Sequence, residues 1–178
     1  YDVFRGGLAD GVKMLTVENG DLRIRILPTR GMGIWDMTYG ERRLGWKSPI
    51  RGPVHPAFVD LGEPSGLGWL DGFDELLVRC GLESNGAPEF DANGRLLYPL
   101  HGRIGNRPAG RVDVTIDPDS QEITVTGYVS ERRFHFHKLL MTTTLKTRAG
   151  EKGFRVRDEI KNLCIECRAS DINLLAVN

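Results

Sequence analysis

Residues 112–129 read VDVTIDPDSQEITVTGYV. In the first part apolar and polar residues alternate, with Val112, Val114 and Ile116 on one side. The second part repeats this pattern from Ile123 to Val129, interrupted by a glycine. Because successive side chains of a β-strand point to opposite faces, each part predicts a strand with one buried and one solvated face. The DPDS sequence between them is a turn signal, so the stretch predicts an antiparallel hairpin.

The same period of two recurs along the chain. Residues 22–26 and 154–160 alternate apolar with charged side chains, and residues 134–147 predict a longer strand with β-branched residues towards its end. Turn signals separate these stretches at residues 18–20, 39–40 and 149–153. We therefore expect an all-β fold, an antiparallel sandwich or barrel, rather than βαβ units.

The composition excludes some classes of function, namely binding to nucleic acid and to membranes. The chain has 178 residues, with 24 Lys and Arg against 24 Asp and Glu. This balance gives no basic surface for nucleic acid or an anionic membrane, so we expect neither partner. No apolar run reaches the ~20 residues that a membrane helix needs. The 22 glycines and nine prolines predict many turns between short strands.

The length fits one domain, residues 1–178. Residues 171–178 read DINLLAVN, an apolar run that predicts a strand entering a core. Since chain ends usually lie at the surface, we expect this β-sandwich domain to be the N-terminal portion of a larger fold that lacks its C-terminal part here. The chain begins with Tyr1 rather than Met, which leaves a removed leader open.

A long irregular region, residues 47–110, interrupts the strands. It is rich in Gly and Pro, and a short helical turn is expected around residues 69–78. A long loop inside a compact domain is usually functional, so we expect the chemistry here.

His101 is the first candidate for that chemistry. It stands before Gly102 and two residues ahead of Arg103, which offers a titratable imidazole beside a guanidinium fork. Gly102 and Gly105 are expected to let a ligand approach the backbone. The alternative is a loop histidine bonded to its own turn.

The other histidines are weaker candidates. His135 and His137 are expected on one face of a strand, where such a pair can form part of a metal site. The alternative places Phe134 and Phe136 in the core and the histidines on the other surface. His55 is expected to be structural or exposed.

The three cysteines predict no disulfide framework. Cys164 and Cys167 have C-x-x-C spacing, but a zinc ribbon needs a second pair and only Cys80 remains. We expect free thiols in a reducing compartment, the cytoplasm.

Arg30 precedes Gly31 and Arg79 stands two residues before Gly81, a setting in which a guanidinium suits planar recognition of hydroxyl pairs or carboxylates. The alternative for each is a salt bridge to a nearby acid. Trp46 and Trp69 are candidates for stacking on a sugar face, or else core residues.

Four motifs in order carry a family resemblance. They are Arg30-Gly31-Met32, Trp46-Lys47-Ser48-Pro49, Cys80-Gly81-Leu82 and Leu100-His101-Gly102-Arg103-Ile104. From about residue 13 to 178 the chain resembles the aldose 1-epimerase-like proteins, closest to an uncharacterised branch with the progression R-G-M, W-x-S-P, C-G-L and L-H-G-R-I. The resemblance implies the galactose mutarotase-like antiparallel β-supersandwich.

The resemblance also implies a reaction, the interconversion of sugar anomers by general acid–base catalysis without metal or cofactor. It assigns His101 as the sugar-polarising catalytic residue. The family's second histidine corresponds to residues 174–178, which contain none, and its base glutamate would lie beyond residue 178. For substrate binding we expect hydroxyl contacts from three arginines, stacking by one tryptophan and two residues that complete the site: Arg30, Arg79, Arg103, Trp46, Glu131 and His137.

Two alternatives to an isomerase stay open. One is a non-catalytic sugar-binding or sensing domain that has lost the acid histidine. The other is a metal enzyme using His101, His135 and His137. For both the isomerase and the sugar-binding domain, the expected partner is a small-molecule sugar. The sequence leaves the oligomeric state open.

Overall fold

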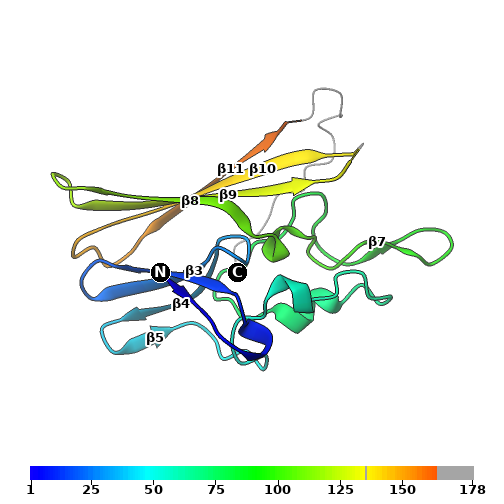
Figure 1. The fold of residues 1–178 in the computed structure, drawn as a ribbon, viewed down its shortest axis with the longest axis horizontal. Coiled ribbons are helices and arrows are strands. Elements are labelled where there is room, and N and C mark those ends of the chain that lie inside the picture. Colours follow the sequence, from blue (N-terminus) through cyan, green and yellow to red (C-terminus); the bar gives the residue numbers. More distant parts are fainter. Residues whose placement is uncertain (135, 164–178) are drawn as a thin grey trace.

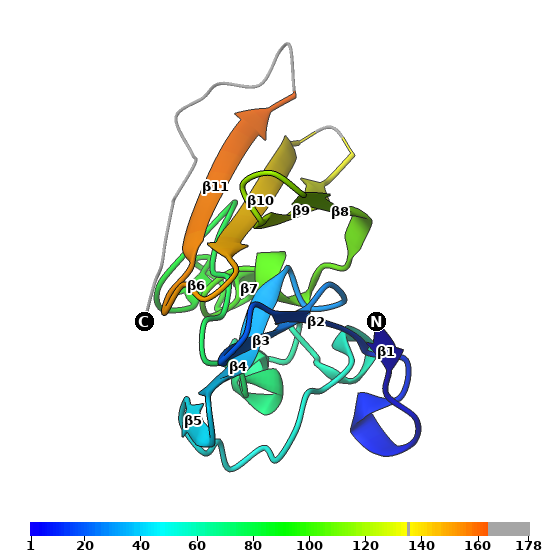
Figure 2. The ribbon, with the colours of Figure 1, turned by 90° about the vertical axis from the view of Figure 1, so that its left-hand side faces the viewer.

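The computed structural model describes residues 1–134 and 136–163, which form two main antiparallel sheets (Figure 1). The five-stranded sheet has the order β1-β2-β3-β4-β5, and the four-stranded sheet has the order β11-β10-β9-β8. Figures 1 and 2 show the four-stranded sheet stacked over the five-stranded one. The strands are β1 (Asp2–Val3), β2 (Lys13–Glu18), β3 (Leu22–Leu27), β4 (Gly33–Tyr39), β5 (Arg42–Leu44), β8 (Ala109–Asp117), β9 (Glu122–Arg132), β10 (Lys138–Arg148) and β11 (Arg155–Asn162).

Between β5 and β8 the chain is mostly irregular. It holds a small hairpin and three short 3₁₀ helices: β6 (Glu89–Phe90), β7 (Leu96–Tyr98), η2 (Pro56–Phe58), η3 (Gly68–Gly72) and η4 (Ile104–Asn106). A further 3₁₀ turn, η1 (Gly7–Ala9), follows β1. The described part of the chain contains no α-helix, so the all-β expectation is confirmed.

The core lies between the two main sheets. Ile24 and Ile26 of β3 pack in one cluster with Val125 and Val129 of β9, and all four are at most 1% exposed. These are the apolar positions of the alternating pattern, while Arg23 and Arg25 of β3 point to the opposite face of the strand. Burying one such side chain stabilises the fold by about 1.5–3 kcal/mol, which explains why the pattern predicts the strands so well.

One irregular stretch runs between the sheets and joins them. We call residues 77–84 the crossing segment. Leu77 pairs with Ile34 of β4 through two backbone hydrogen bonds, and Leu82 is buried in the core. The crossing segment also forms a parallel bridge to the loop of His101, between Gly81 and Gly102.

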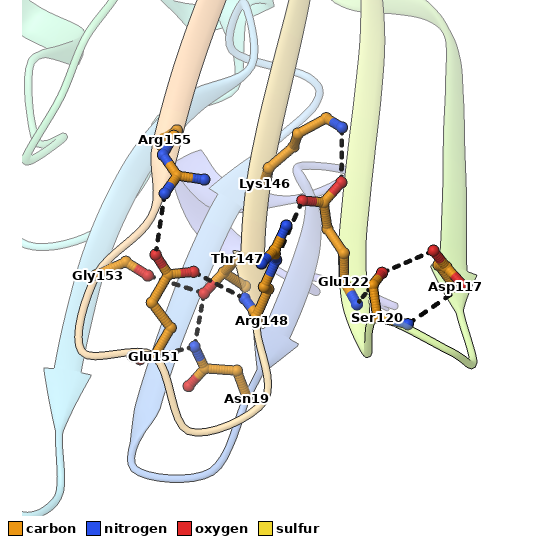
Figure 3. A network of polar contacts seen from close by, with 10 residues as sticks. All are labelled: Asn19, Asp117, Ser120, Glu122, Lys146, Thr147, Arg148, Glu151, Gly153 and Arg155. Atoms are coloured by element: carbon orange, nitrogen blue, oxygen red, sulfur yellow. Dashed lines mark hydrogen bonds and ion pairs between the residues drawn. The ribbon is translucent and has the colours of Figure 1, made fainter.

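Polar contacts connect the two sheets at the end of the sandwich that holds the β2–β3 turn and the hairpin after β10 (Figure 3). The Asn19 side chain, after β2, donates to the Thr147 hydroxyl of β10 at 2.6 Å and to the Glu151 carbonyl at 2.9 Å. The Gly150 amide donates in turn to the Asn19 carbonyl. Nearby, Lys146 pairs with Glu122 across β10 and β9. These contacts fix the hairpin after β10 against the turn between β2 and β3.

Two expectations about local structure need correction. The strand expected to begin at residue 134 begins at Lys138, because a turn closes the β9–β10 hairpin around Arg133. Phe134 and Phe136 are 83% and 55% exposed, so they do not fill the core. His137 therefore precedes the strand rather than lying on its face. The helical turn expected over residues 69–78 is the shorter η3.

Some expectations fall outside the described residues: the strand at residues 171–178, Cys164 and Cys167, and His135. Among the described residues, no helix combines the length and apolar character needed to cross a bilayer.

Candidate functional site

The crossing segment places Arg79 against the inner face of the four-stranded sheet. Its Nη1 lies 3.4 Å from Oδ2 of Asp158 on β11, and that carboxylate also accepts from the Thr143 hydroxyl of β10. The Arg79 side chain is only 6% exposed, and its Nε and Nη2 have no hydrogen-bond partner. Burial lowers the pKa of this guanidinium, with Asp158 acting in the opposite direction. Two buried donor nitrogens are therefore left without an acceptor, at a cost that a ligand oxygen would relieve.

His101 has left-handed backbone geometry, with φ 55°. Its amide donates to the Gly86 carbonyl and its carbonyl accepts from Gly81, both at 2.9 Å. A non-glycine residue in this region costs of order 1–3 kcal/mol, and such residues cluster at functional sites. The ring packs edge-on against Trp69, and its buried Nδ1 has no partner. Burial lowers the pKa of His101, which makes the neutral imidazole the main form at pH 7.

Aromatic side chains connect His101 to the protein surface. Trp69 packs on Phe73 with ring centroids 4.7 Å apart, and Phe73 packs on Trp46 at 4.9 Å. Trp69 is 2% exposed, so the structure places it in a core cluster. Trp46 is 40% exposed and anchored by Nε1 donating to the Glu75 carbonyl. Of the two tryptophans, only Trp46 presents a ring to solvent.

A second polar cluster lies where the crossing segment meets the end of β9. The Glu131 carboxylate is 1% exposed and accepts from the amides of Leu82 and Glu83 at 3.3 and 3.1 Å. The His137 ring lies beside it, with Nε2 3.7 Å from Glu131 and Nδ1 3.1 Å from Glu83. Glu131 and His137 are expected at the site from the sequence, whereas Glu83 is not. No local pattern marks Glu83, because only the fold brings it to residues about fifty positions away.

The Arg30 side chain lies in the protein interior and not at a surface where it could contact a sugar. Its side chain is 0% exposed, and its Nε donates to the equally buried Glu75 at 2.5 Å. Nη1 donates to the Val54 carbonyl and to Asn106 Oδ1. The structure thus gives Arg30 the salt bridge that was the alternative, and leaves no exposed surface on it for a sugar.

Two further residues have simple placements. The Arg103 amide donates to the Gly81 carbonyl, so its half-buried side chain starts beside the crossing segment. His55 accepts from the Ala57 amide through Nδ1 and caps η2, which confirms its structural role.

Protein backbone, rather than space for a ligand, lies next to the glycines around His101. A Cβ at Gly102 would lie 2.3 Å from the Ser84 carbonyl oxygen, and one at Gly105 would lie 2.5 Å from that of Arg79. The expectation that these glycines admit a ligand is therefore wrong, because backbone of the crossing segment fills the space. Their absent side chains let the His101 loop and the crossing segment pack backbone against backbone.

The stacked antiparallel sheets with polar groups between them form an all-β fold, and two comparisons with known proteins bear out the expected resemblance to aldose 1-epimerase-like proteins. The family model described as a domain of unknown function, DUF4432, matches residues 9–171, and the chain belongs to this family. A crystal structure of a "putative aldose 1-epimerase" from Klebsiella pneumoniae subsp. pneumoniae MGH 78578 is similar, with a TM-score of 0.85 and 40% sequence identity. The alignment covers 91% of this chain and 42% of that one.

This chain thus spans less than half the length of the similar solved protein. No curated protein matches it. That residues 1–178 form one domain of a larger sandwich stays a prediction.

Proposed function

We propose that the protein binds a small sugar at the inner face of the four-stranded sheet and interconverts its anomers. The observation that carries this proposal is His101, a half-buried and neutral imidazole whose buried Nδ1 has no partner, held in a strained loop beside the crossing segment. Perturbed titratable groups and backbone strain tend to coincide at functional sites. The name of the similar Klebsiella pneumoniae protein supports the same reaction class.

The proposed reaction is ring opening and reclosure by proton transfer. A base removes the proton of the anomeric hydroxyl, the C1–O bond of the ring breaks, and the ring oxygen takes both electrons and a proton. Rotation of the resulting aldehyde and the reverse steps give the other anomer. Positioned acid–base groups contribute typically 10²–10⁴-fold to such steps. None of these proton transfers requires a metal or cofactor.

His101 has the properties needed to polarise the sugar. A neutral imidazole donates an N–H to a sugar oxygen without bringing a full charge into a buried site. The free Nε and Nη2 of Arg79 offer three N–H groups for hydroxyls. Arg103, Glu131 and His137 are the proposed further contacts.

Trp46 is the proposed stacking residue, since its ring is partly exposed. We assign Arg30 an indirect role, because its side chain is fully buried and its Nε and Nη1 are hydrogen-bonded to Glu75 and Asn106, although Nη2 has no partner. The base glutamate stays where the resemblance places it, beyond residue 178.

The test is exchange between anomers, followed by NMR magnetisation transfer for a panel of aldoses at equilibrium. The full protein should accelerate exchange of at least one aldose, and His101→Ala should reduce this at least about 100-fold. The control is His55→Ala, which removes the loop histidine that caps η2 and should leave the rate unchanged. A full protein that accelerates no aldose above the buffer rate contradicts the isomerase.

A non-catalytic sugar-binding domain is the second candidate. The observation that favours it is the absence of histidine from residues 174–178, where the resemblance expects the acid. It predicts saturable binding by calorimetry without anomer exchange, weakened by Trp46→Ala. Exchange above the buffer rate excludes it.

A further inference from the structure

Three metal-ligating side chains meet from three separate parts of the chain. Glu83 comes from the crossing segment, Glu131 from the end of β9, and His137 from the residues just before β10. One ligand atom from each lies within 4.8 Å of the other two. The cluster lies at the C-terminal end of the crossing segment. Arg79, nearer the start of that segment, pairs with Asp158 instead.

The cluster holds more negative than positive charge. Two carboxylates and one imidazole carry a net charge of −2 with a neutral ring and −1 with a protonated one. The exposed fractions of the side chains are 13% for Glu83, 1% for Glu131 and 16% for His137. Among the described residues, His137 is the only basic side chain that pairs with either carboxylate. Burying a carboxylate without a full countercharge is costly, so the site favours an added cation.

The donor set and spacing suit a divalent metal. Carboxylate oxygens with one imidazole nitrogen are ligands shared by Mn²⁺ and Zn²⁺. Two neighbouring ligands with bonds of about 2.1 Å lie roughly 3–3.5 Å apart. His137 Nδ1 and Glu83 Oε1 are separated by 3.1 Å, and the other ring nitrogen, Nε2, lies 3.7 Å from Glu131. The amides of Leu82 and Glu83 donate hydrogen bonds to the Glu131 carboxylate and fix its orientation. Metal-ligating carboxylates are oriented by hydrogen bonds in the same way.

We propose that Glu83, Glu131 and His137 bind one divalent transition-metal cation. Three protein ligands leave coordination positions for water or for hydroxyl oxygens of a ligand. This inference goes beyond the proposed function, whose proton transfers need no metal, and it departs from the metal-free expectation of the resemblance. It also differs from the metal site considered on sequence, since His101 takes no part.

The first experiment measures metal without any sugar. The full protein, purified without chelator, is analysed for bound metal, stripped with chelator, and titrated with Mn²⁺ and with Zn²⁺ by calorimetry. We expect one equivalent of one of these ions per chain. For Mn²⁺, electron paramagnetic resonance should show loss of the free-ion signal at the same stoichiometry.

Variants identify the ligands. Glu83→Gln and His137→Asn keep the approximate shapes of partly exposed side chains and should each weaken binding at least 10-fold. Glu89→Gln removes an exposed carboxylate from β6 and should leave affinity unchanged. Absence of stoichiometric binding, or affinity that is equal in all three variants and the wild type, overturns the proposal. In that case the ring of His137 serves only to bridge the two carboxylates.

The two proposals fail separately. Metal binding without anomer exchange keeps the cation site and contradicts the isomerase. Anomer exchange by stripped protein that takes up neither ion keeps the isomerase and contradicts the cation site.

Discussion

Replacing Arg30 by Met tests whether this residue holds the fold or binds the sugar. The change leaves Glu75, 1% exposed, without its ion-pair partner, and it also frees the acceptors Val54 and Asn106. Removing one member of a buried pair costs about 3–5 kcal/mol, because the remaining charge stays buried and unpaired. Both side chains are almost fully buried, so solvent screening does not reduce this value. For a chain of 178 residues the expected fall in Tm is roughly 10 °C.

The assay is thermal and urea unfolding of Arg30→Met, Glu75→Leu and the double variant. The double variant should be more stable than the sum of the single losses predicts, since it leaves no orphaned charge. The matched control is Arg23→Met. Its ion pair with Glu18 is about half exposed on both sides, and such pairs contribute less than about 1 kcal/mol.

Equal, small losses for Arg30→Met and Arg23→Met would refute this reasoning. An unchanged Tm combined with a selective loss of sugar affinity would return Arg30 to the sugar-binding set. The expected result is the reverse, a large loss of stability with sugar affinity retained by the folded fraction.

Three further predictions concern the His101 loop and its neighbours. Gly102→Ala should lower the free energy of unfolding by more than about 2 kcal/mol, because φ is 72° and the new Cβ would meet the Ser84 carbonyl; Gly110→Ala, with open space around it, is the control. Burial lowers the pKa of His101 below 6.5, so the unfolded chain takes up this proton first, and stability should fall as pH drops below 6.5. Unfolding from pH 5 to 7.5 should show that slope reduced in His101→Gln, and an identical slope contradicts the assignment. Burial raises the pKa of Cys80 to about 11, so alkylation at pH 8, mapped by mass spectrometry, should modify it only after denaturation.

The sequence predicts the strands well wherever one face is buried. Residues 22–27 and 122–132 are strands because their apolar alternation matches the spacing of the core. The same reasoning failed at residues 134–137, where Phe and His also alternate. There the chain turns, and Phe134 and Phe136 lie on the surface of the hairpin tip. Period two identifies a strand's faces but does not show where the hairpin reverses.

The candidate site was only partly predictable, for a different reason. His101 precedes Gly102 and Arg79 stands two residues before Gly81, and close packing of the two glycine-containing segments explains both the composition and the position of these residues. Glu83 has no such neighbour pattern. Its contact with His137 spans 54 positions in the sequence and depends on where the crossing segment leaves the core. Composition and local spacing carry no information about such a contact.

The crossing segment therefore makes the stability of the sandwich and the geometry of both polar sites interdependent. Leu77 pairs with β4 and Leu82 is buried between the sheets, so the position of the backbone between them is set by the core. That backbone carries Arg79 to Asp158 and supplies the amides that hold Glu131. Because packed cores move between discrete arrangements rather than deform continuously, neither polar site can shift without repacking Leu82. The fold thus fixes charged groups that no short motif encodes.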